Sequence, residues 1–227
     1  MNEFLSRLKL MLSNEELDNI LTKKIILFGV GGVGGSVAEM LVRSGISNLT
    51  IVDFDKIDIT NINRQIIATH SNIGQLKVEA FKDRLLDINP NLKLSTIDKA
   101  LTEENISDFS LSNYDYVIDC IDDLKAKKAL IKFCYEHKIK ILVSCGAGNR
   151  YKGVPNFEVE DIYKTSYDAI AKLLRKFCSE ERIKHLTVVY TKQKSLKFDC
   201  KTIGSVVYYP MSMASVIVAK VINDILL

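Results

Sequence analysis

The stretch from Lys24 to Asp55 constrains the fold of this chain more than any other part of the sequence. It opens with an apolar, β-branched run at residues 25–28, which is too short for a helix and predicts a buried strand. The sequence GVGGVG follows at residues 29–34, and a helical pattern of apolar residues then leads to a second strand at 49–52. A strand, a glycine-rich turn, a helix and a strand in this order are typical of a nucleotide-binding βαβ unit.

Each part of this unit has a physical role in holding a phosphate-bearing ligand. Glycine lets the backbone approach phosphates because no Cβ atom intervenes, and the following helix offers free N–H groups and a partial positive charge. Asp53, after the second strand, is placed to accept hydrogen bonds from ribose hydroxyls. A dinucleotide is the default ligand, and a glycine-rich turn without a ligand is the alternative. The predicted contacts come from Gly29, Gly31, Gly32, Gly34 and Asp53.

A polar loop follows the second strand, in the place where ligands bind in doubly wound sheets. It contains Asp55 and the sequence NINRQ at residues 61–65. Arg64 can bind phosphate through two parallel N–H groups, and the amides of Asn61 and Asn63 can donate without charge. The alternative is a loop whose side chains cap its own backbone. We predict that Asp55, Asn61, Asn63 and Arg64 contact the nucleotide.

Two further charged positions indicate an anionic ligand and a cation. Lys77 lies in the first turn of a helix predicted at residues 75–88, where a cation opposes the helix dipole, so we expect an anion beside it. An ordinary surface lysine is the alternative. Asp122 and Asp123 follow a strand predicted at residues 114–121. Adjacent carboxylates raise each other's pKa unless a cation offsets them, so a divalent metal is their natural partner.

The order of predicted elements indicates the fold class. Strands and helices alternate about five times between residues 24 and 145, which predicts an α/β fold with a doubly wound, mainly parallel, Rossmann-like sheet. We expect residues 1–150 to form the nucleotide-binding domain, and residues 151–227 to add a smaller α/β extension that forms one compact unit with it. Further predicted elements are helices at 1–23, 102–109 and 123–137 and strands at 92–97 and 139–144, with Lys125, Lys127 and Lys128 exposed on the helix at 123–137.

The last third of the sequence is less regular. Residues 168–180 have a helical pattern, and residues 186–191 alternate as a strand does. The sequence GSVVYYP at 204–210 predicts a strand that ends at proline. An almost wholly apolar helix is expected at residues 211–226, either in the core or at a subunit interface.

Composition narrows the possible classes of protein. The net charge is +3, but residues 164–201 carry ten Lys and Arg against four acids, so that segment is +6. Its basic side chains are either a solvated surface or a patch for a polyanion such as RNA. The five cysteines are scattered without a C-x-x-C pair, which argues against a zinc site or a disulfide framework. We expect no transmembrane helix and no signal peptide, and therefore a cytosolic protein.

The ordered motifs GVGGVG, IVDFD, TNINRQ, GQLKVE, INP and VIDCIDD resemble those of the ubiquitin-activating-type (ThiF/MoeB/HesA) ATP-binding superfamily. The segments SCGAGN, VEDIYKTSYDAIAKLLRK, LTVVYTKQ and GSVVYYPMSMA are similar to the tRNA threonylcarbamoyladenosine dehydratase branch. The sulfur-carrier-activating branches usually hold a zinc in paired C-x-x-C motifs, which this sequence lacks.

The resemblance implies a role for each matching residue. Gly32 would lie in the glycine turn, Asp53 on the ribose, and Asn61 and Arg64 on the phosphates. Lys77 would lie near the β- and γ-phosphates, Asp122 would bind Mg²⁺, and Arg7 would reach the ATP of the neighbouring subunit in a homodimer. Within the resemblance, Arg64, Lys77, Asp122 and Arg7 are the catalytic residues.

The resemblance also implies the reaction. A carboxylate attacks the α-phosphate of ATP, and in this branch it belongs to threonylcarbamoyladenosine beside the tRNA anticodon. Capture of the activated acyl group within the substrate gives the cyclic form with net loss of water. The implied cofactors are ATP and Mg²⁺, with room for a monovalent cation, and the implied partners are tRNA and a second subunit. The alternatives are an adenylyltransferase for a ubiquitin-like sulfur carrier, a nucleotide-binding module without turnover and, least supported, an NAD oxidoreductase.

Overall fold

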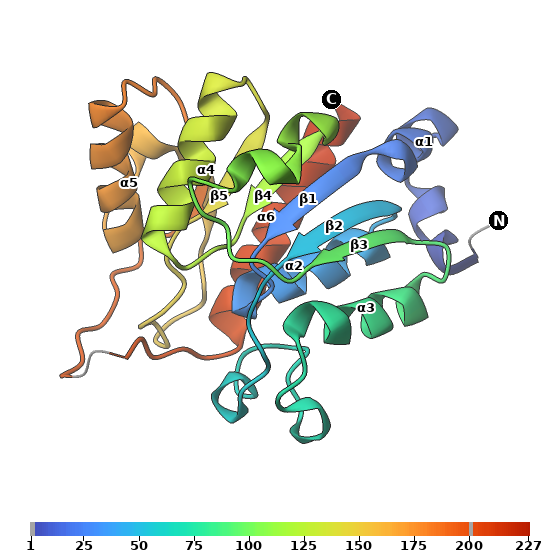
Figure 1. The fold of residues 1–227 in the computed structure, drawn as a ribbon, viewed down its shortest axis with the longest axis horizontal. Helices are drawn as coiled ribbons and strands as arrows, with labels where there is room; N and C mark the ends of the chain where they lie inside the picture. The colour runs from blue at the N-terminus through green and yellow to red at the C-terminus, as the bar shows by residue number, and fades with distance from the viewer. Residues whose placement is uncertain (1–2, 200–201) are drawn as a thin grey trace.

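The computed structural model describes residues 3–199 and 202–227, and within them a single seven-stranded sheet forms the centre of the fold. The strand order is β3-β2-β1-β4-β5-β7-β6, and neighbouring strands are parallel except that β6 runs antiparallel to β7. The predicted doubly wound α/β architecture is thus confirmed (Figure 1). The strands are β1 (Lys24–Phe28), β2 (Asn48–Val52), β3 (Lys93–Ile97), β4 (Tyr116–Asp119), β5 (Ile141–Ser144), β6 (Glu158–Asp161) and β7 (Thr187–Tyr190).

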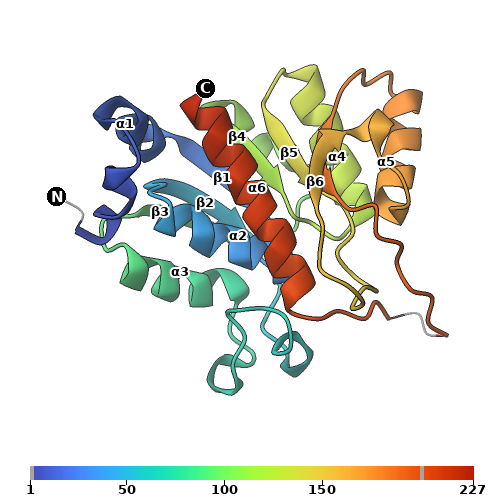
Figure 2. The same cartoon turned by 180° about the vertical axis from the view of Figure 1, so that it is seen from behind.

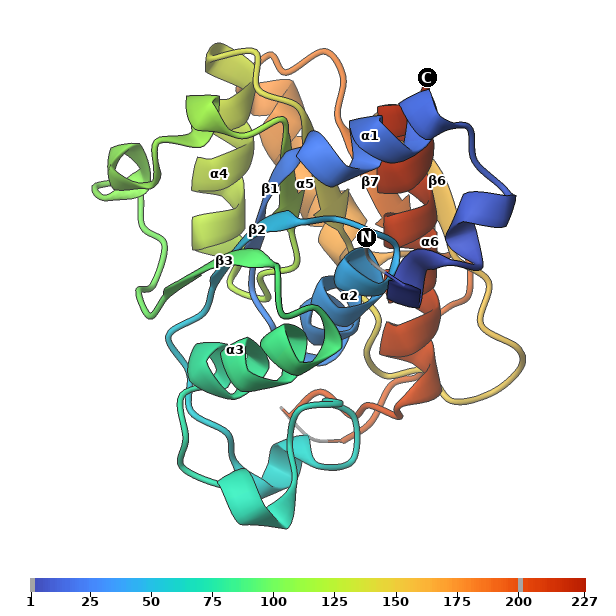
Figure 3. The ribbon, with the colours of Figure 1, turned by 90° about the vertical axis from the view of Figure 1, so that its right-hand side faces the viewer.

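Helices cover both faces of the sheet (Figure 3). α1, α2, α3 and α6 pack on one face, and α4 and α5 pack on the other, together with short 3₁₀ turns. Figure 2 shows α6 crossing the sheet beside α2. The helices are α1 (Asn14–Thr22), α2 (Gly32–Arg43), α3 (Lys77–Ile88), α4 (Leu124–Glu136), α5 (Ala169–Glu180) and α6 (Tyr208–Leu226).

β1 shows why the sequence forms a central strand with helices on both sides. Alternate side chains of a strand point to opposite faces of the sheet. Ile25 and Leu27 join the core under α2 and α6, whereas Ile26 and Phe28 join the core under α4. All four are at most 1% exposed. Burying each such side chain stabilises the fold by roughly 1.5–3 kcal/mol, which explains an uninterrupted apolar run instead of an alternating one.

Two glycines of the GVGGVG sequence are required by close packing. Gly29 has a φ of +81°, and a Cβ there would lie 2.7 Å from the carbonyl oxygen of Cys120 at the end of β4. A Cβ on Gly34 would lie 1.8 Å from the Gly29 oxygen. α2 can therefore begin directly against the turn, and β1 can lie next to β4, only because these side chains are absent.

Residues 3–23 do not form one helix, contrary to the prediction of a helix at 1–23. Two 3₁₀ turns, η1 (Glu3–Leu5) and η2 (Leu8–Leu10), precede α1. Ser13 interrupts them because its backbone is extended, with a φ of −67° and a ψ of 164°. The backbone N–H of Glu16 donates to the Ser13 Oγ and that of Ser13 to the Glu16 carboxylate, so the predicted capping box starts α1.

The prediction of a helix at residues 102–109 is also wrong. The structure has two 3₁₀ turns instead, η5 (Ile106–Phe109) and η6 (Leu111–Asn113). The side chain of Asn105 accepts from the N–H of Thr102, and the Thr102 hydroxyl accepts from the N–H of Asn105. These bonds close a local turn at residues 102–105, and the left-handed Ser110 (φ 46°) ends η5 before a longer helix can form.

Residues 204–210 do not form the predicted strand. α6 begins at Tyr208, and Pro210 lies in its first turn, where a residue without an N–H costs nothing. Gly204 bonds to Asn149, in the loop after β5, instead of joining the sheet. The N–H of Asn149 donates to the Gly204 carbonyl oxygen, and the N–H of Gly204 donates to Asn149 Oδ1, both at 2.7 Å. β6, which the sequence did not predict, forms the antiparallel edge.

α6 is long and apolar enough to cross a membrane by length and composition, with a mean hydropathy of 1.2. That property is weak evidence for a membrane span, because the core helix of a globular protein has it too. Tyr209, Met213 and Ile217 are fully buried against α2 and the sheet. The choice left open between core and interface is therefore decided in favour of the core for this face of the helix.

Substituting Gly34 and Gly32 should separate packing from helix propensity. Gly34→Ala is expected to lower the free energy of unfolding by about 3 kcal/mol or more, because its Cβ would collide with backbone. A Cβ at Gly32 would lie 3.4 Å from the Pro210 side chain and 3.6 Å from the Arg64 carbonyl oxygen, which are ordinary contacts. Gly32→Ala should therefore leave stability unchanged or raise it by about 0.5–1 kcal/mol. Urea unfolding followed by circular dichroism measures both, and equal losses in the two variants would contradict the packing account.

Candidate functional site

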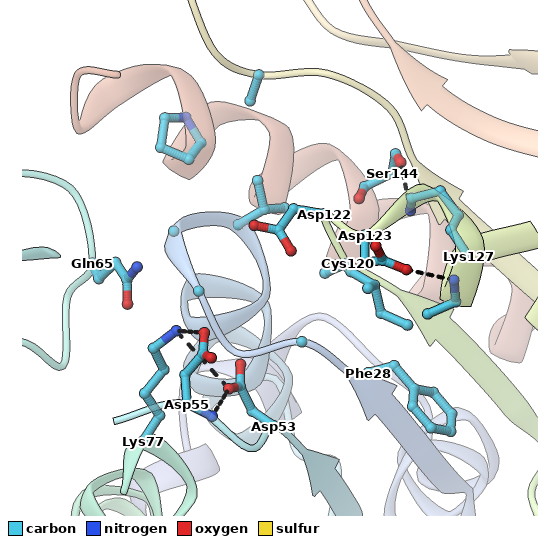
Figure 4. Close-up of a pocket in the computed structure, with 18 of the residues that line it drawn as sticks. Phe28, Asp53, Asp55, Gln65, Lys77, Cys120, Asp122, Asp123, Lys127 and Ser144 are labelled. Carbon is cyan, nitrogen blue, oxygen red and sulfur yellow. Dashed lines mark hydrogen bonds and ion pairs between the residues drawn. The ribbon is translucent and has the colours of Figure 1, made fainter. Parts of the chain in front are cut away.

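A cleft of about 850 Å³ opens at the carboxyl ends of the parallel strands (Figure 4). The loop that follows β2 and the loops that follow β1, β4 and β5 all line it. This is where ligands bind in doubly wound sheets. The structure gathers nine of the twelve predicted site residues in its walls: Gly29, Gly31, Gly32, Asp53, Asp55, Asn61, Arg64, Lys77 and Asp122.

Three predicted residues lie elsewhere. Gly34 is buried behind the turn, where it contacts Gly29. Asn63 is exposed, and its amide donates to the Ser205 carbonyl oxygen at 3.0 Å, so it joins the polar loop to the segment before α6. Arg7 is exposed in the N-terminal segment and is absent from the lining of the cleft.

The glycine turn offers backbone to the cleft. Gly31 and Gly32 face it, and Gly32 begins α2, whose first N–H groups have no partner within the helix. Among the described residues, a Cβ on Gly31 would meet only the Gln65 amide, at 3.9 Å, so that space is open to a ligand. The helix N-terminus therefore presents a partial positive charge to the cleft, which suits a phosphate.

Asp53 is held at the floor of the cleft by the turn itself. Its Oδ2 accepts from the N–H of Val30 at 2.8 Å, and its Oδ1 accepts from that of Asp55 at 2.9 Å. Burial raises the pKa of the Asp53 carboxyl, and the positive charge of Lys77 opposes that shift. The lone pairs that remain on the two oxygens can accept hydroxyl groups of a ligand.

Lys77 has an anionic neighbour within the chain. Its Nζ lies 2.7 Å from Asp55 Oδ2 and 3.9 Å from Asp53 Oδ1, and its side chain is 6% exposed. Asp55 is half exposed, so the pair sits at the boundary between the wall and solvent. The cation at this helix N-terminus is thus compensated by carboxylates. A bound phosphate could also use it, because an ammonium group has three donors.

The polar loop after Asp55 directs Arg64 toward the cleft. Arg64 Nη1 donates to the Thr60 carbonyl at 2.6 Å and to the Asn63 side chain at 3.2 Å. Its Nε and Nη2 atoms have no partner among the described residues, so they remain available to an anion. Asn61 is buried and accepts from the N–H of Asp58 at 3.1 Å, which closes the 3₁₀ turn η3 (Ile59–Asn61). Asn61 thus caps the backbone of the loop while Arg64 keeps donors for a ligand, so the two alternatives for this loop are compatible.

The two adjacent acids after β4 have different surroundings. Asp123 is the N-cap of α4, since its Oδ1 accepts from the N–H of Ala126 at 2.7 Å. Asp122 makes no hydrogen bond with the described residues and lines the cleft. A carboxylate that faces a phosphate site without a partner can hold Mg²⁺, which is usually bound by one or two carboxylates together with phosphate oxygens. No group of three or more metal-ligating side chains occurs among the described residues.

Lys127 is buried, contrary to the expectation that it is exposed on α4. Its Nζ lies 2.9 Å from Asp119 Oδ1 and 3.1 Å from the Ser144 carbonyl oxygen, and its side chain is 3% exposed. The i, i+4 apolar pattern of α4 gave no sign of this pair, because the partner is the last residue of β4. Asp119 Oδ1 also accepts from the N–H of Ile121 at 3.0 Å, so the pair shapes the turn that carries Asp122.

Sequence reasoning missed several residues of the cleft wall. Gln65 is 6% exposed, and its Oε1 is buried without a partner in the described structure. Its position directly after Arg64 was the available signal. Ser144 and the loop Cys145–Gly148 after β5 also line the cleft. A ligand that fills the cleft would contact this loop opposite the polar loop.

The cysteines of the cleft are not activated. Burial raises the pKa of the Cys120 thiol to about 12 and raises that of Cys145 further. Both thiols are therefore protonated at neutral pH, and a thiol is a weak nucleophile compared with a thiolate. Cys134 and Cys178 are also free and buried, and Cys200 lies outside the described residues.

Removing the buried cation should destabilise the fold in a pH-dependent way. Lys127→Met leaves Asp119 buried without a counter-charge, so we expect the free energy of unfolding to fall by about 3–5 kcal/mol at pH 7. Burial already raises the pKa of Asp119 above its unfolded value of about 3.9, and the loss of Lys127 raises it further. The penalty should therefore shrink as pH falls from 7 toward the unfolded pKa, and it should be lost below that pKa, where the carboxyl is protonated in both states.

The matched control is the double variant Lys127→Met with Asp119→Leu, which removes both charges. It should recover most of the lost stability, because replacing both partners by apolar residues leaves no unpaired buried charge. Urea unfolding at pH 7 and pH 4.5 compares the variants. A loss that is the same at both pH values would show that lost packing, and not charge, is responsible.

Comparisons with known proteins agree with this geometry. A family model described as "ThiF family" matches residues 5–226. The tRNA threonylcarbamoyladenosine dehydratase of Escherichia coli (strain K12) is 36% identical over 86% of this chain and 71% of its own length. The enzyme of the same name from Bacillus subtilis (strain 168) is 40% identical over 79% of this chain and 70% of its own.

Solved structures agree as well. The crystal structure of the E. coli dehydratase in complex with ATP superposes on this chain with a TM-score of 0.91 and 28% sequence identity. The match covers 98% of this chain and 93% of the E. coli chain. Its complex with AMP gives a TM-score of 0.90. These matches confirm the resemblance drawn from the motifs. This chain belongs to the ThiF family.

Proposed function

We propose that this chain is an ATP-dependent tRNA threonylcarbamoyladenosine dehydratase. It would activate the carboxylate of threonylcarbamoyladenosine by adenylation and then release the cyclic product. The observation that carries the proposal is the convergence of the α2 N-terminus, Arg64, Lys77 and Asp122 on one cleft. The similarity to dehydratases at 36–40% identity supplies the substrate class.

The arrangement of groups suits attack on an α-phosphate. In such a transfer the protein mainly positions the reactants and neutralises developing charge. The free Nε and Nη2 groups of Arg64 and the ammonium of Lys77 would provide that charge. Asp53 would receive the ribose, and the N–H groups at Gly32 would approach the phosphates.

Asp122 would hold Mg²⁺ together with the ATP phosphates, and the metal would neutralise phosphate charge when bound. The fit rests on an unpartnered carboxylate beside a phosphate site.

No protein nucleophile is needed after adenylation. The adenylate is attacked by a group of the same modified nucleoside, a new bond closes the ring, and AMP leaves. The protonated thiols of Cys120 and Cys145 agree with this route, because neither is prepared for attack. The chain would then work without a sulfur-transfer partner, as expected for a cytoplasmic tRNA-modifying enzyme.

A direct test is ATP–pyrophosphate exchange measured with and without tRNA that carries the open nucleoside. Exchange should depend on that tRNA, and mass spectrometry of the digested tRNA should show conversion to a form lighter by one water. Exchange driven instead by a carrier protein ending in Gly-Gly would favour the sulfur-carrier reaction. Binding of ATP without exchange under either condition would indicate a module without turnover.

Arg64→Ala tests the assigned charge. Among the described residues the Arg64 side chain bonds only within its own loop, so the fold should persist and the thermal unfolding curve should change little. Loss of a transition-state cation should lower kcat by about 10³-fold. Arg43→Ala, which removes an exposed arginine on α2, is the control and should keep full activity. An active Arg64→Ala enzyme would contradict the role.

A homodimer in which each subunit supplies Arg7 to its neighbour is part of the proposal. Arg7 is exposed and remote from its own cleft, and the surrounding segment exposes Phe4, Leu10 and Met11. An isologous dimer would bury such a surface and make the contribution reciprocal.

Mixing inactive subunits tests this arrangement. Arg7→Ala and Arg64→Ala should each be inactive alone, whereas a random mixture should recover about a quarter of wild-type activity, because each heterodimer holds one intact site. Activity is assayed after the subunits are unfolded together and refolded. If the mixture stays inactive while size-exclusion chromatography shows dimers, Arg7 does not act across the interface.

A further inference from the structure

One buried arginine joins three segments at the edge of the cleft. The guanidinium of Arg150 donates from Nε to the Gln193 carbonyl oxygen at 2.8 Å, and from Nη1 to the oxygens of Gly146 at 2.9 Å and Gly148 at 3.1 Å. Its Nη2 lies 3.3 Å from Asp168 Oδ2, and both side chains are at most 4% exposed. Because Gly146 and Gly148 line the cleft, this network builds part of its rim.

Each segment carries an exposed side chain directly next to the network. Tyr151 follows Arg150, Tyr167 precedes Asp168, and Lys194 follows Gln193. Tyr151 is 47% exposed and Tyr167 is 63% exposed, which is high for large rings. We call Tyr151, Lys152, Tyr167 and Lys194 the rim cluster.

The backbone that presents Tyr151 is held in place from α6. The hydroxyl of Tyr208 donates to the Tyr151 carbonyl oxygen at 2.7 Å, and the hydroxyl of Tyr209 donates to that of Lys152, also at 2.7 Å. Figure 2 shows the yellow loop after β5 beside the N-terminal end of α6. The ring of Tyr151 is therefore exposed on a rigid support and not at the end of a loose loop.

Tyr167 is held in a costly conformation. Its φ is +57°, a left-handed value that bulky residues adopt rarely. The adjoining Asp168 accounts for its persistence, because this carboxylate caps α5 at Ala171 and accepts from the N–H of Gly146 at 3.2 Å. Such strain persists where the surroundings impose it, and it is concentrated at functional sites.

The cluster combines two rings with two cations, and none of its four residues is acidic. Lys152 Nζ lies 5.7 Å from the centre of the Tyr151 ring, and Lys194 Nζ lies 5.0 Å from that of Tyr167. The nearby acid Asp168 is buried and paired, and Glu158 is paired with Lys192 at 2.8 Å. Rings beside ammonium groups bind unpaired nucleic acid, because bases stack on the rings while phosphates meet the cations.

We propose that the rim cluster stacks the unpaired bases of an RNA loop that lie next to the nucleotide entering the cleft. This inference rests on the proposed function, because it takes the anticodon loop of tRNA as the partner. An RNA duplex fits less well, since its bases are already stacked and offer only backbone to the surface. The network around Arg150 positions the rings relative to the cleft.

The test measures binding separately from turnover. A fluorescent anticodon stem-loop is titrated with wild-type protein and with the double variant Tyr151→Leu/Tyr167→Leu. We expect the variant to bind at least about tenfold more weakly, because each stacked base contributes substantially to affinity. Tyr151→Phe/Tyr167→Phe keeps both rings and loses only hydroxyls that bond to no described residue, so its affinity should stay within about twofold of wild type.

Two controls separate stacking from general attraction to a polyanion. Tyr135→Leu removes a similarly exposed ring on α4, outside the cleft, and should leave the affinity unchanged. Lys194→Ala should lower the slope of log K against log salt by about 0.7, whereas the double leucine variant should not change that slope. Thermal unfolding confirms that each variant is folded.

The proposal is overturned if the double leucine variant binds the stem-loop as wild type does. It is also overturned if the phenylalanine variant loses as much affinity, or if a duplex of equal length loses affinity in parallel. Failure of the proposed function is a different result. In that case the wild-type protein forms no cyclic nucleoside, whatever the rings contribute to binding.

Discussion

The approach of the glycine turn to the end of β4 is the contact on which the rest of the structure depends. The Gly29 N–H donates to the Val52 carbonyl at 2.8 Å, and Cys120 N–H donates to that of Phe28 at 2.8 Å. These bonds continue the ladders of β1 with β2 and β4 past the strand ends. The loops that follow three strands therefore begin at one point, and a cleft forms there instead of three separate loops.

Charge at the edge of the cleft is organised by ion pairs whose cationic side chains are buried. Lys77 contacts Asp55 and Asp53, Lys127 contacts Asp119, and Arg150 contacts Asp168. A buried pair contributes little net stability, because desolvation offsets most of the attraction. Its effect is geometric, since each partner is expensive to leave unpaired and so fixes the loop that carries it. The Lys77 pair holds the polar loop, the Lys127 pair holds the turn that carries Asp122, and the Arg150 pair holds the loop after β5.

The residues that would contact the substrate are distinct from those that hold the loops in place, and this arrangement suits an adenylating enzyme. The side chains free to meet substrate, Arg64 and Asp122, lie in loops whose backbones are held by other residues. Preorganised charges need not reorient as the transition state forms, which is the main source of electrostatic catalysis. The segment after β7 completes the rim through its bonds with Asn149 and Asn63, so the least regular part of the sequence borders the cleft.

The sequence by itself determined the alternating sheet, the glycine turn and the polar loop, because these depend on local periodicity and on glycine at positions that exclude a Cβ. It could not place Lys127, whose helical position resembles a surface site until Asp119 at the end of β4 lies beside it. It also assigned residues 204–210 to a strand, since the bonds between Gly204 and Asn149 join residues 55 positions apart. The tertiary structure alone decided the ion pairs and the rim cluster, because each joins segments that only the folded sheet brings together.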